Sequence, residues 1–167
     1  MSTLYVDNLQ PNLGNAVHAA GHCVQCEHYE IGGSAIVVGS GTFTDLASIS
    51  FTPKYASSHL HIDISYHVYI TDTATDVWRG VNVRLLRNDI GLAGDESSHY
   101  GHAYFRMSDL DRSMSYQARM FVDTSHNTTS AITYKFQGLS RNGEVGIHFN
   151  NPNYGDQCRI RIMEIAQ

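Results

Sequence analysis

The stretch Ser58-His-Leu-His-Ile-Asp-Ile-Ser-Tyr-His-Val-Tyr-Ile-Thr71 alternates apolar and polar side chains along almost its whole length. Successive side chains of an extended chain point to opposite faces, so this alternation predicts a long strand with one buried face. The predicted buried face carries Leu60, Ile62, Ile64, Tyr66, Val68 and Ile70. The opposite face carries His59, His61, Asp63, Ser65, His67 and Tyr69, so it is polar and aromatic with little charge.

The same period of two recurs along most of the chain and predicts a fold without helices. Further strands are expected near 17–29, 35–38, 43–51, 81–85, 102–107, 116–122, 132–137, 145–149 and 158–162. In the strand near 116–122, the alternation favours a core face made of Tyr116, Ala118, Met120 and Val122. Turn-forming clusters separate these strands, and Asn142-Gly143 is the pair typical of a type I′ hairpin.

About ten short strands at this spacing predict an all-β fold, most simply a jelly-roll β-sandwich. The chain of 167 residues is long enough for one core, so we expect a single domain over 16–167 after a lead-in segment over 1–15.

Charge is scarce in this composition. Charged residues make up 16% of the chain, whereas an average soluble domain has about 25%. The net charge is −5, and Lys54 and Lys135 are the only lysines, so we expect no nucleic-acid partner. No apolar run approaches the roughly 20 residues of a membrane helix, so we expect no membrane insertion.

Several strands have apolar or aromatic residues on both faces, and one of the two faces must pack in the core. A second, uncharged face is typical of a subunit interface, which would also explain the shortage of charge. The interface candidates are His59, His61, His67, Tyr69 and Tyr104. A weakly buried face or a face that contacts carbohydrate remains as an alternative.

An ordered set of short stretches resembles the C-terminal tail-fibre or adhesin domains of bacteriophages, especially cyanophages. The similar stretches are 4–11, 41–62, 83–91, 133–136, 145–150 and 160–166. Residues 64–69 are also similar to a strand of the tumour necrosis factor and C1q domains, whose jelly roll assembles as a trimer. His59 and His61 depart from the phage pattern, which has Lys and an aliphatic residue there.

This resemblance implies a homotrimeric virion protein, made in the bacterial host cytoplasm, that meets the host surface. Its implied partners are other tail or fibre proteins and a host cell-surface glycan or protein. The resemblance implies no catalytic residues and no cofactor, so we expect no enzymatic activity. The second hypothesis, a different class of function, is a purely structural trimer that decorates or stabilises the capsid or tail.

A cupin-like metal-dependent enzyme is the third hypothesis, because His59, His61 and Asp63 share one strand face. The Glu and the second His motif of a cupin are not evident, so we expect a hydrogen-bonded polar row and no metal. Cys23 and Cys26 form a C-x-x-C in an extended stretch, where they point to opposite faces and cannot bridge each other.

Receptor binding is expected in polar turns that combine carboxylates or amides with an aromatic ring. The candidates are Asp76, Trp78, Arg79, Asp95, Glu96, His99, Tyr100, Asn153 and Tyr154. Trp78 is the only tryptophan and is predicted to lie in a polar loop. An ordinary polar turn with a locally packed aromatic ring is the alternative at each position.

Overall fold

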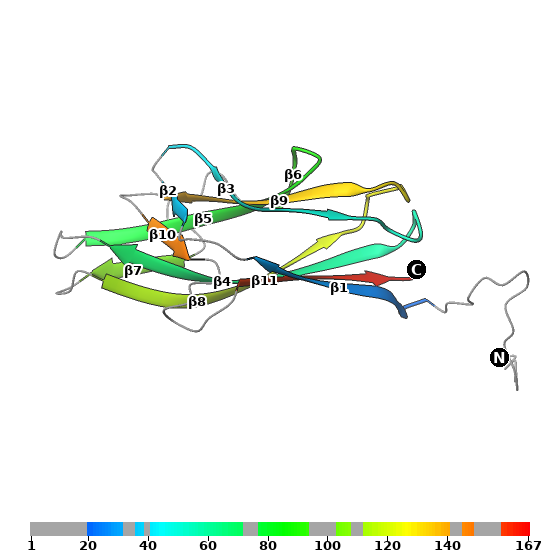
Figure 1. Ribbon diagram of the computed structural model, residues 1–167, viewed down its shortest axis with the longest axis horizontal. Coiled ribbons are helices and arrows are strands. Elements are labelled where there is room, and N and C mark those ends of the chain that lie inside the picture. Colours follow the sequence, from blue (N-terminus) through cyan, green and yellow to red (C-terminus); the bar gives the residue numbers. More distant parts are fainter. Residues whose placement is uncertain are drawn as a thin grey trace, which may run out of the picture.

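A computed structural model describes residues 20–31, 36–38, 41–71, 77–93, 103–107, 112–140, 145–148 and 158–167. These residues form two layers of strands (Figure 1). The strands are β1 (Cys23–Ile31), β2 (Ile36–Val38), β3 (Thr44–Phe51), β4 (His59–Thr71), β5 (Val77–Arg87), β6 (Ile90–Ala93), β7 (Ala103–Met107), β8 (Arg112–Asp123), β9 (Ile132–Ser140), β10 (Val145–His148) and β11 (Cys158–Ile165).

The all-β prediction is confirmed, and none of the described residues lies in a helix. The described part of the chain therefore has no helix long and apolar enough to cross a membrane. It contains eleven strands where about ten were expected, because the short return strand β6 had no sequence signal.

The strands form two antiparallel sheets. One sheet has the order β1-β11-β4-β10-β2, and β8 pairs with the other side of β4. The second sheet has the order β3-β9-β5-β6, and β7 also pairs with β5. The chain crosses between the layers repeatedly, so strands distant in sequence, such as β1 and β11, lie side by side.

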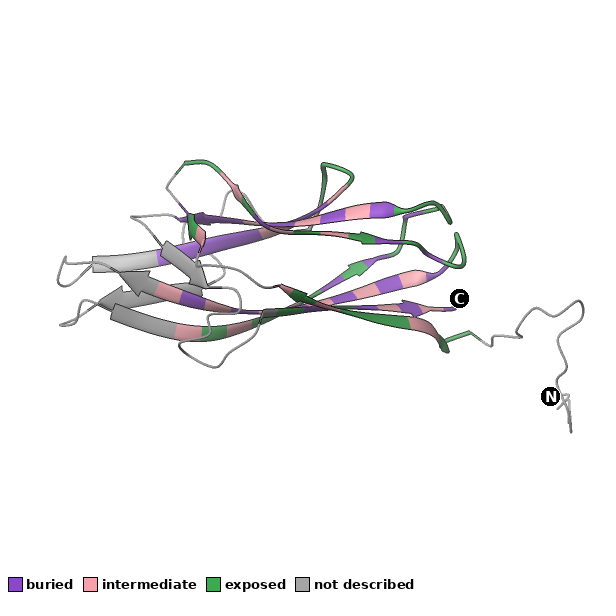
Figure 2. Cartoon of the chain, in the orientation of Figure 1, coloured by how far each residue is buried: buried purple, intermediate pink, exposed green. Residues whose placement is uncertain are grey.

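The inner face of β4 confirms the predicted alternation. Its side chains at Leu60, Ile62, Ile64, Tyr66 and Val68 are at most 1% exposed. They pack against β5 and β9 of the facing sheet, where the ring of Tyr66 lies 5.2 Å from that of Phe136. Burying one such aliphatic side chain contributes about 1.5–3 kcal/mol, so this layer between the sheets holds the sandwich together (Figure 2).

Strand β5 begins earlier than the sequence predicted, which corrects the expected position of Trp78. Trp78 pairs with Arg106 and Arg79 pairs with Phe105, so both lie in a strand and not in a polar loop. Valine and tryptophan favour extended backbone, and β7 supplies the hydrogen-bonding partner that the local sequence could not reveal.

Strand β8 turns Tyr116, Ala118, Met120 and Val122 away from the core, which is the reverse of the prediction. Its register with β4 places Phe121 opposite Ile62 and Met120 opposite Asp63. Directly paired residues lie on the same face of a sheet. Because Ile62 faces the core, Phe121 also faces it, and Met120 faces outward. The predicted core set, Tyr116, Ala118, Met120 and Val122, is exposed.

Candidate functional site

The site that the structure presents is the outer face of the sheet formed by β1, β11, β4 and β8. Cross-strand pairing builds it in rows: Cys26–Met163–His61–Val122, His28–Arg161–Asp63–Met120 and Glu30–Arg159–Ser65–Ala118. His67 and Tyr116 extend it along β4 and β8. We call the part made by His61, Ser65, His67, Tyr116, Ala118, Met120 and Val122 the β4–β8 surface.

Large apolar side chains are exposed on the β4–β8 surface. Met120 is 65% exposed, Tyr116 57% and Val122 41%. Beside them, His61 and His67 are half-buried, and the ring of His67 meets that of Tyr116 edge to face at 5.0 Å. The contiguous position of these side chains distinguishes them from isolated surface hydrophobic residues.

Four of the five interface candidates lie on this outer face. His59, His61, His67 and Tyr69 share the outward side of β4, and each is half-buried. Tyr104 belongs to β7 of the other sheet, so the structure does not bring it to them. Sequence reasoning missed the contribution of β8, because it assigned the apolar residues of that strand to the core.

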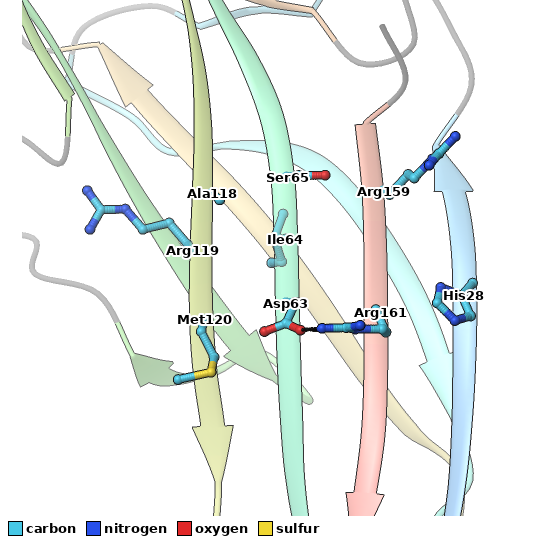
Figure 3. Close-up of a pocket in the computed structure, with 9 residues that line it drawn as sticks. All are labelled: His28, Asp63, Ile64, Ser65, Ala118, Arg119, Met120, Arg159 and Arg161. Carbon is cyan, nitrogen blue, oxygen red and sulfur yellow. Dashed lines mark hydrogen bonds and ion pairs between the residues drawn. The ribbon is translucent and has the colours of Figure 1, made fainter.

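A shallow depression of about 520 Å³ lies in the middle of the outer face (Figure 3). The small side chains of Ser65 and Ala118 leave the space, with Met120 on one side and His28 on the other. The Arg161 guanidinium donates to Asp63 through Nε at 3.0 Å and through Nη2. This interaction raises the pKa of Arg161, and the two charges compensate each other.

The third hypothesis placed a metal ion on the histidine row of β4. Within the described ranges, no three His, Cys, Asp or Glu side chains come together in a way that could hold an ion. Asp63 is already engaged by Arg161, so it is held toward β11.

A second cluster contains the residue types of a hydrolase triad but lacks its geometry. Ser58 Oγ lies 3.2 Å from His126 Nε2 and donates to Glu164 Oε1 at 2.7 Å. In a catalytic triad the imidazole stands between hydroxyl and carboxylate, whereas here the hydroxyl stands between the other two. Ser58 is only 1% exposed, so its oxygen is closed to a substrate. The cluster is therefore structural.

Glu164 is the centre of this structural cluster. Its carboxylate is 0% exposed and accepts hydrogen bonds from the backbone N–H groups of Lys54 and Tyr55, Ser58 Oγ and Gln25 Nε2. Burial raises the pKa of Glu164, but these hydrogen bonds outweigh it, and the net effect is a lowered pKa. The carboxylate thus ties the β3–β4 loop to the last strand.

Asp123 is a second buried carboxylate, and it holds the β8–β9 loop in place. It is 0% exposed, pairs with Arg87 Nη1 at 2.7 Å, and accepts hydrogen bonds from Tyr134 Oη and from the backbone N–H of Ser125. Burial, the hydrogen bond and the negative charge of Asp123 raise the pKa of Tyr134. Glu164 is in phase with the inward residues Ile160 and Ile162, which is the signal that could have found it. Asp123 lies on the side of β8 that was predicted to face outward, so the sequence carried no such signal for it.

Most receptor-binding candidates lie outside the described residues. These are Asp76, Asp95, Glu96, His99, Tyr100, Asn153 and Tyr154. The backbone of Trp78 and Arg79 lies in β5, close to the point where β4 ends and β8 begins. That end of the sandwich is opposite to the end fixed by Glu164.

Comparison with known proteins gives distant similarity in structure alone. No protein-family model and no curated protein matches the chain. The dimeric latent PorU of Porphyromonas gingivalis is 13% identical with a TM-score of 0.45, over 94% of this chain and 14% of PorU. VP2 of infectious bursal disease virus, in a subviral particle, is 11% identical with a TM-score of 0.45, over 96% of this chain and 41% of VP2. The chain spans less than half the length of either protein.

Proposed function

We propose that this chain is a structural module of a virion fibre or tail that self-associates into a homotrimer through its outer face. The sequence resemblance to phage tail-fibre domains and to the tumour necrosis factor and C1q domains supports this proposal. The architecture is compatible with it, since the described strands form two antiparallel sheets, of six and five strands, that face each other as in a jelly roll.

The observation that carries the proposal is the exposed apolar row on β8. Removing a half-exposed Met, Tyr or Val side chain from water contributes on the order of 1–2 kcal/mol. Met120, Tyr116 and Val122 are neighbours on one strand, so one partner surface can cover all three. Their alternation with inward residues of the same strand turns them away from the core that the described residues form.

A second copy of this chain is the partner that fits the surface best. Neighbouring strands lie about 4.8 Å apart, and each residue adds about 3.3 Å along a strand. A face of four strands with about seven residues each therefore covers on the order of 400 Å². A standard interface buries about 800 Å² per partner, so this face supplies about half of one interface and the rest must come from residues beyond it. The nearby charges of Asp63 and Arg161 pair with each other.

A charge placed in the apolar row tests the proposal. Met120→Asp should convert an assembled wild-type protein to monomer, measured by light scattering coupled to size exclusion. Ile90→Asp is the matched control, because Ile90 is 69% exposed but lies on β6 of the other sheet. A wild-type protein that stays monomeric at high concentration would overturn the proposal, and so would equal dissociation of both variants.

We further propose that the trimer binds a host surface glycan or protein near the end of the sandwich that carries Trp78. This part rests on the residue types of the sequence candidates. Adsorption of labelled protein to host cells should fall with Trp78→Ala while the assembly state is unchanged. Adsorption that is absent in the wild type would favour the purely structural alternative.

A further inference from the structure

Histidines are concentrated on the outward side of β4. His59, His61 and His67 alternate with the buried residues of that strand, and all three are half-buried. His61 and His67 belong to the β4–β8 surface, next to the exposed apolar row of β8. An unperturbed imidazole gains a proton between about pH 8 and about pH 5, so a face rich in histidine becomes more positive in this range.

Across the sheet, His61 is flanked by apolar side chains. Its register partners are Met163 of β11 and Val122 of β8. The exposed thiol of Cys26 follows beyond Met163 in the same row. Methionine and valine cannot compensate the charge of an imidazolium. When a second copy covers Val122, a proton on His61 is therefore held in a largely apolar contact, where an uncompensated charge is costly.

Along β4, the outward neighbours of His61 are His59 and Asp63. His59 is a second group that becomes positive in acid, so it repels a charge on His61. The Asp63 carboxylate already accepts hydrogen bonds from Arg161 Nε, at 3.0 Å, and from Nη2. A shift of Asp63 toward His61 would take this carboxylate from the guanidinium of Arg161. Asp63 therefore does not compensate a protonated His61.

His67 lies in a similar environment further along the β4–β8 surface. Its ring packs edge to face on Tyr116, and its register partner on β10 is His148. Arg159 of β11 lies in the next row, and Glu30 is the register partner of Arg159 on β1. Among the described outward residues of this sheet, each carboxylate thus already faces an arginine.

We propose that the assembly is acid-sensitive: it forms while His61 and His67 are neutral and dissociates as they gain protons. Such acid sensitivity rests on the proposed self-association through the outer face. Neutral imidazoles leave this face free of uncompensated charge, so a second copy can cover it. Protonated imidazoles must either keep their water or repel the copies that cover them, so association weakens as the pH falls.

Light scattering coupled to size exclusion, at about pH 8 and about pH 5.5 and at constant ionic strength, tests the proposal. Exclusion of one proton weakens association by up to about tenfold per pH unit, so the wild type should associate about tenfold or more weakly at the lower pH. The double variant His61→Gln/His67→Gln keeps polar side chains without the change of charge, and it should stay assembled at both pH values. His22→Gln is the matched control, because His22 precedes β1 and lies outside the β4–β8 surface, and it should dissociate as the wild type does.

Calorimetry of wild-type dilution at about pH 6.5 gives a second readout that needs no variant. Dissociation should take up protons, so the heat should differ between two buffers of different ionisation enthalpy. A wild type that is monomeric at about pH 8 would overturn the proposed self-association and the acid sensitivity with it. Equally tight assembly at both pH values, or equal heats in the two buffers, would overturn the acid sensitivity alone. Dissociation of the double variant to the same extent as the wild type would also overturn it, since other groups would then be responsible.

Discussion

Strands β4 and β8 are neighbours with similar alternation and opposite outcomes. β4 buries its apolar residues between the sheets, whereas β8 buries Phe121 and Asp123 and exposes Tyr116, Met120 and Val122. Alternation is a property of one strand, but the side that faces the core is fixed by the register with the next strand. An apolar row in the sequence is therefore not by itself evidence of a core.

The two sides of this sheet have different roles. The inner side stabilises the monomer, and the exposed row of β8 is available to a second molecule. Mutations on the two sides should therefore differ in what they change, namely the free energy of unfolding on one side and assembly on the other.

The largest effect is expected at the inner side of β4. Ile62→Ala should lower the free energy of unfolding by about 2–5 kcal/mol, because Ile62 is 0% exposed and its truncation leaves a cavity. His61→Ala, its outward neighbour, should change it by about 0.5 kcal/mol or less. Urea denaturation of dilute, monomeric protein measures both, and similar losses in the two variants would contradict the assignment of faces.

Within β8 the same contrast should appear between consecutive residues. Phe121→Ala should cost about 3 kcal/mol of monomer stability, since Phe121 is 9% exposed. Met120→Ala should cost about 0.5 kcal/mol or less in the monomer, since Met120 is 65% exposed. A larger loss of stability for Met120→Ala than for Phe121→Ala would instead support the sequence prediction that Met120 faces the core.

A smaller effect is expected at the end of the sandwich held by Glu164. Glu164→Gln keeps the size of the side chain but weakens its hydrogen bonds, so it should cost about 1–3 kcal/mol at neutral pH. The folded-state pKa of Glu164 is lowered, so its stabilising contribution is present above the unfolded-state pKa.

That contribution is lost as the pH falls through the lowered folded-state pKa. Thermal unfolding from pH 7 into the acid range should thus show a steeper loss of stability in the wild type than in Glu164→Gln. Parallel pH profiles for the two proteins would contradict a charged, hydrogen-bonded Glu164.

The smallest effect is expected for the ring pair on the outer face. Tyr116→Leu removes the edge-to-face contact with His67, which is worth about 0.5–1.5 kcal/mol in general and less at an exposed site. Monomer unfolding should change only slightly, whereas self-association should weaken. A stability loss as large as that of Phe121→Ala would show that Tyr116 belongs to the core.

The sequence predicted what depends on local alternation. The strands near β3, β4 and β9 and the buried faces of Leu60 to Val68 are confirmed, because several strong apolar positions agree there. The facing of β8 and the start of β5 at Val77 were predicted wrongly, since both depend on a partner strand distant in sequence.

For the candidate site, the sequence found the polar, histidine-rich side of β4 but not the residues that complete it. Glu164 and Asp123 were missed because their burial as charged groups depends on partners distant in sequence, such as Lys54 in the β3–β4 loop and Arg87 at the end of β5. The receptor candidates other than Trp78 and Arg79 lie outside the described residues and stay predictions.

The most direct test of the account is whether Met120 becomes covered when the protein assembles. Peroxide oxidation of Met120, followed by peptide mass spectrometry, reports the exposure of this side chain at high and low protein concentration. If Met120 is covered in the assembly, its oxidation should be slow at high concentration and fast on dilution or in Tyr116→Asp. Fast oxidation at every concentration, as the 65% exposure in the monomer implies, would contradict it.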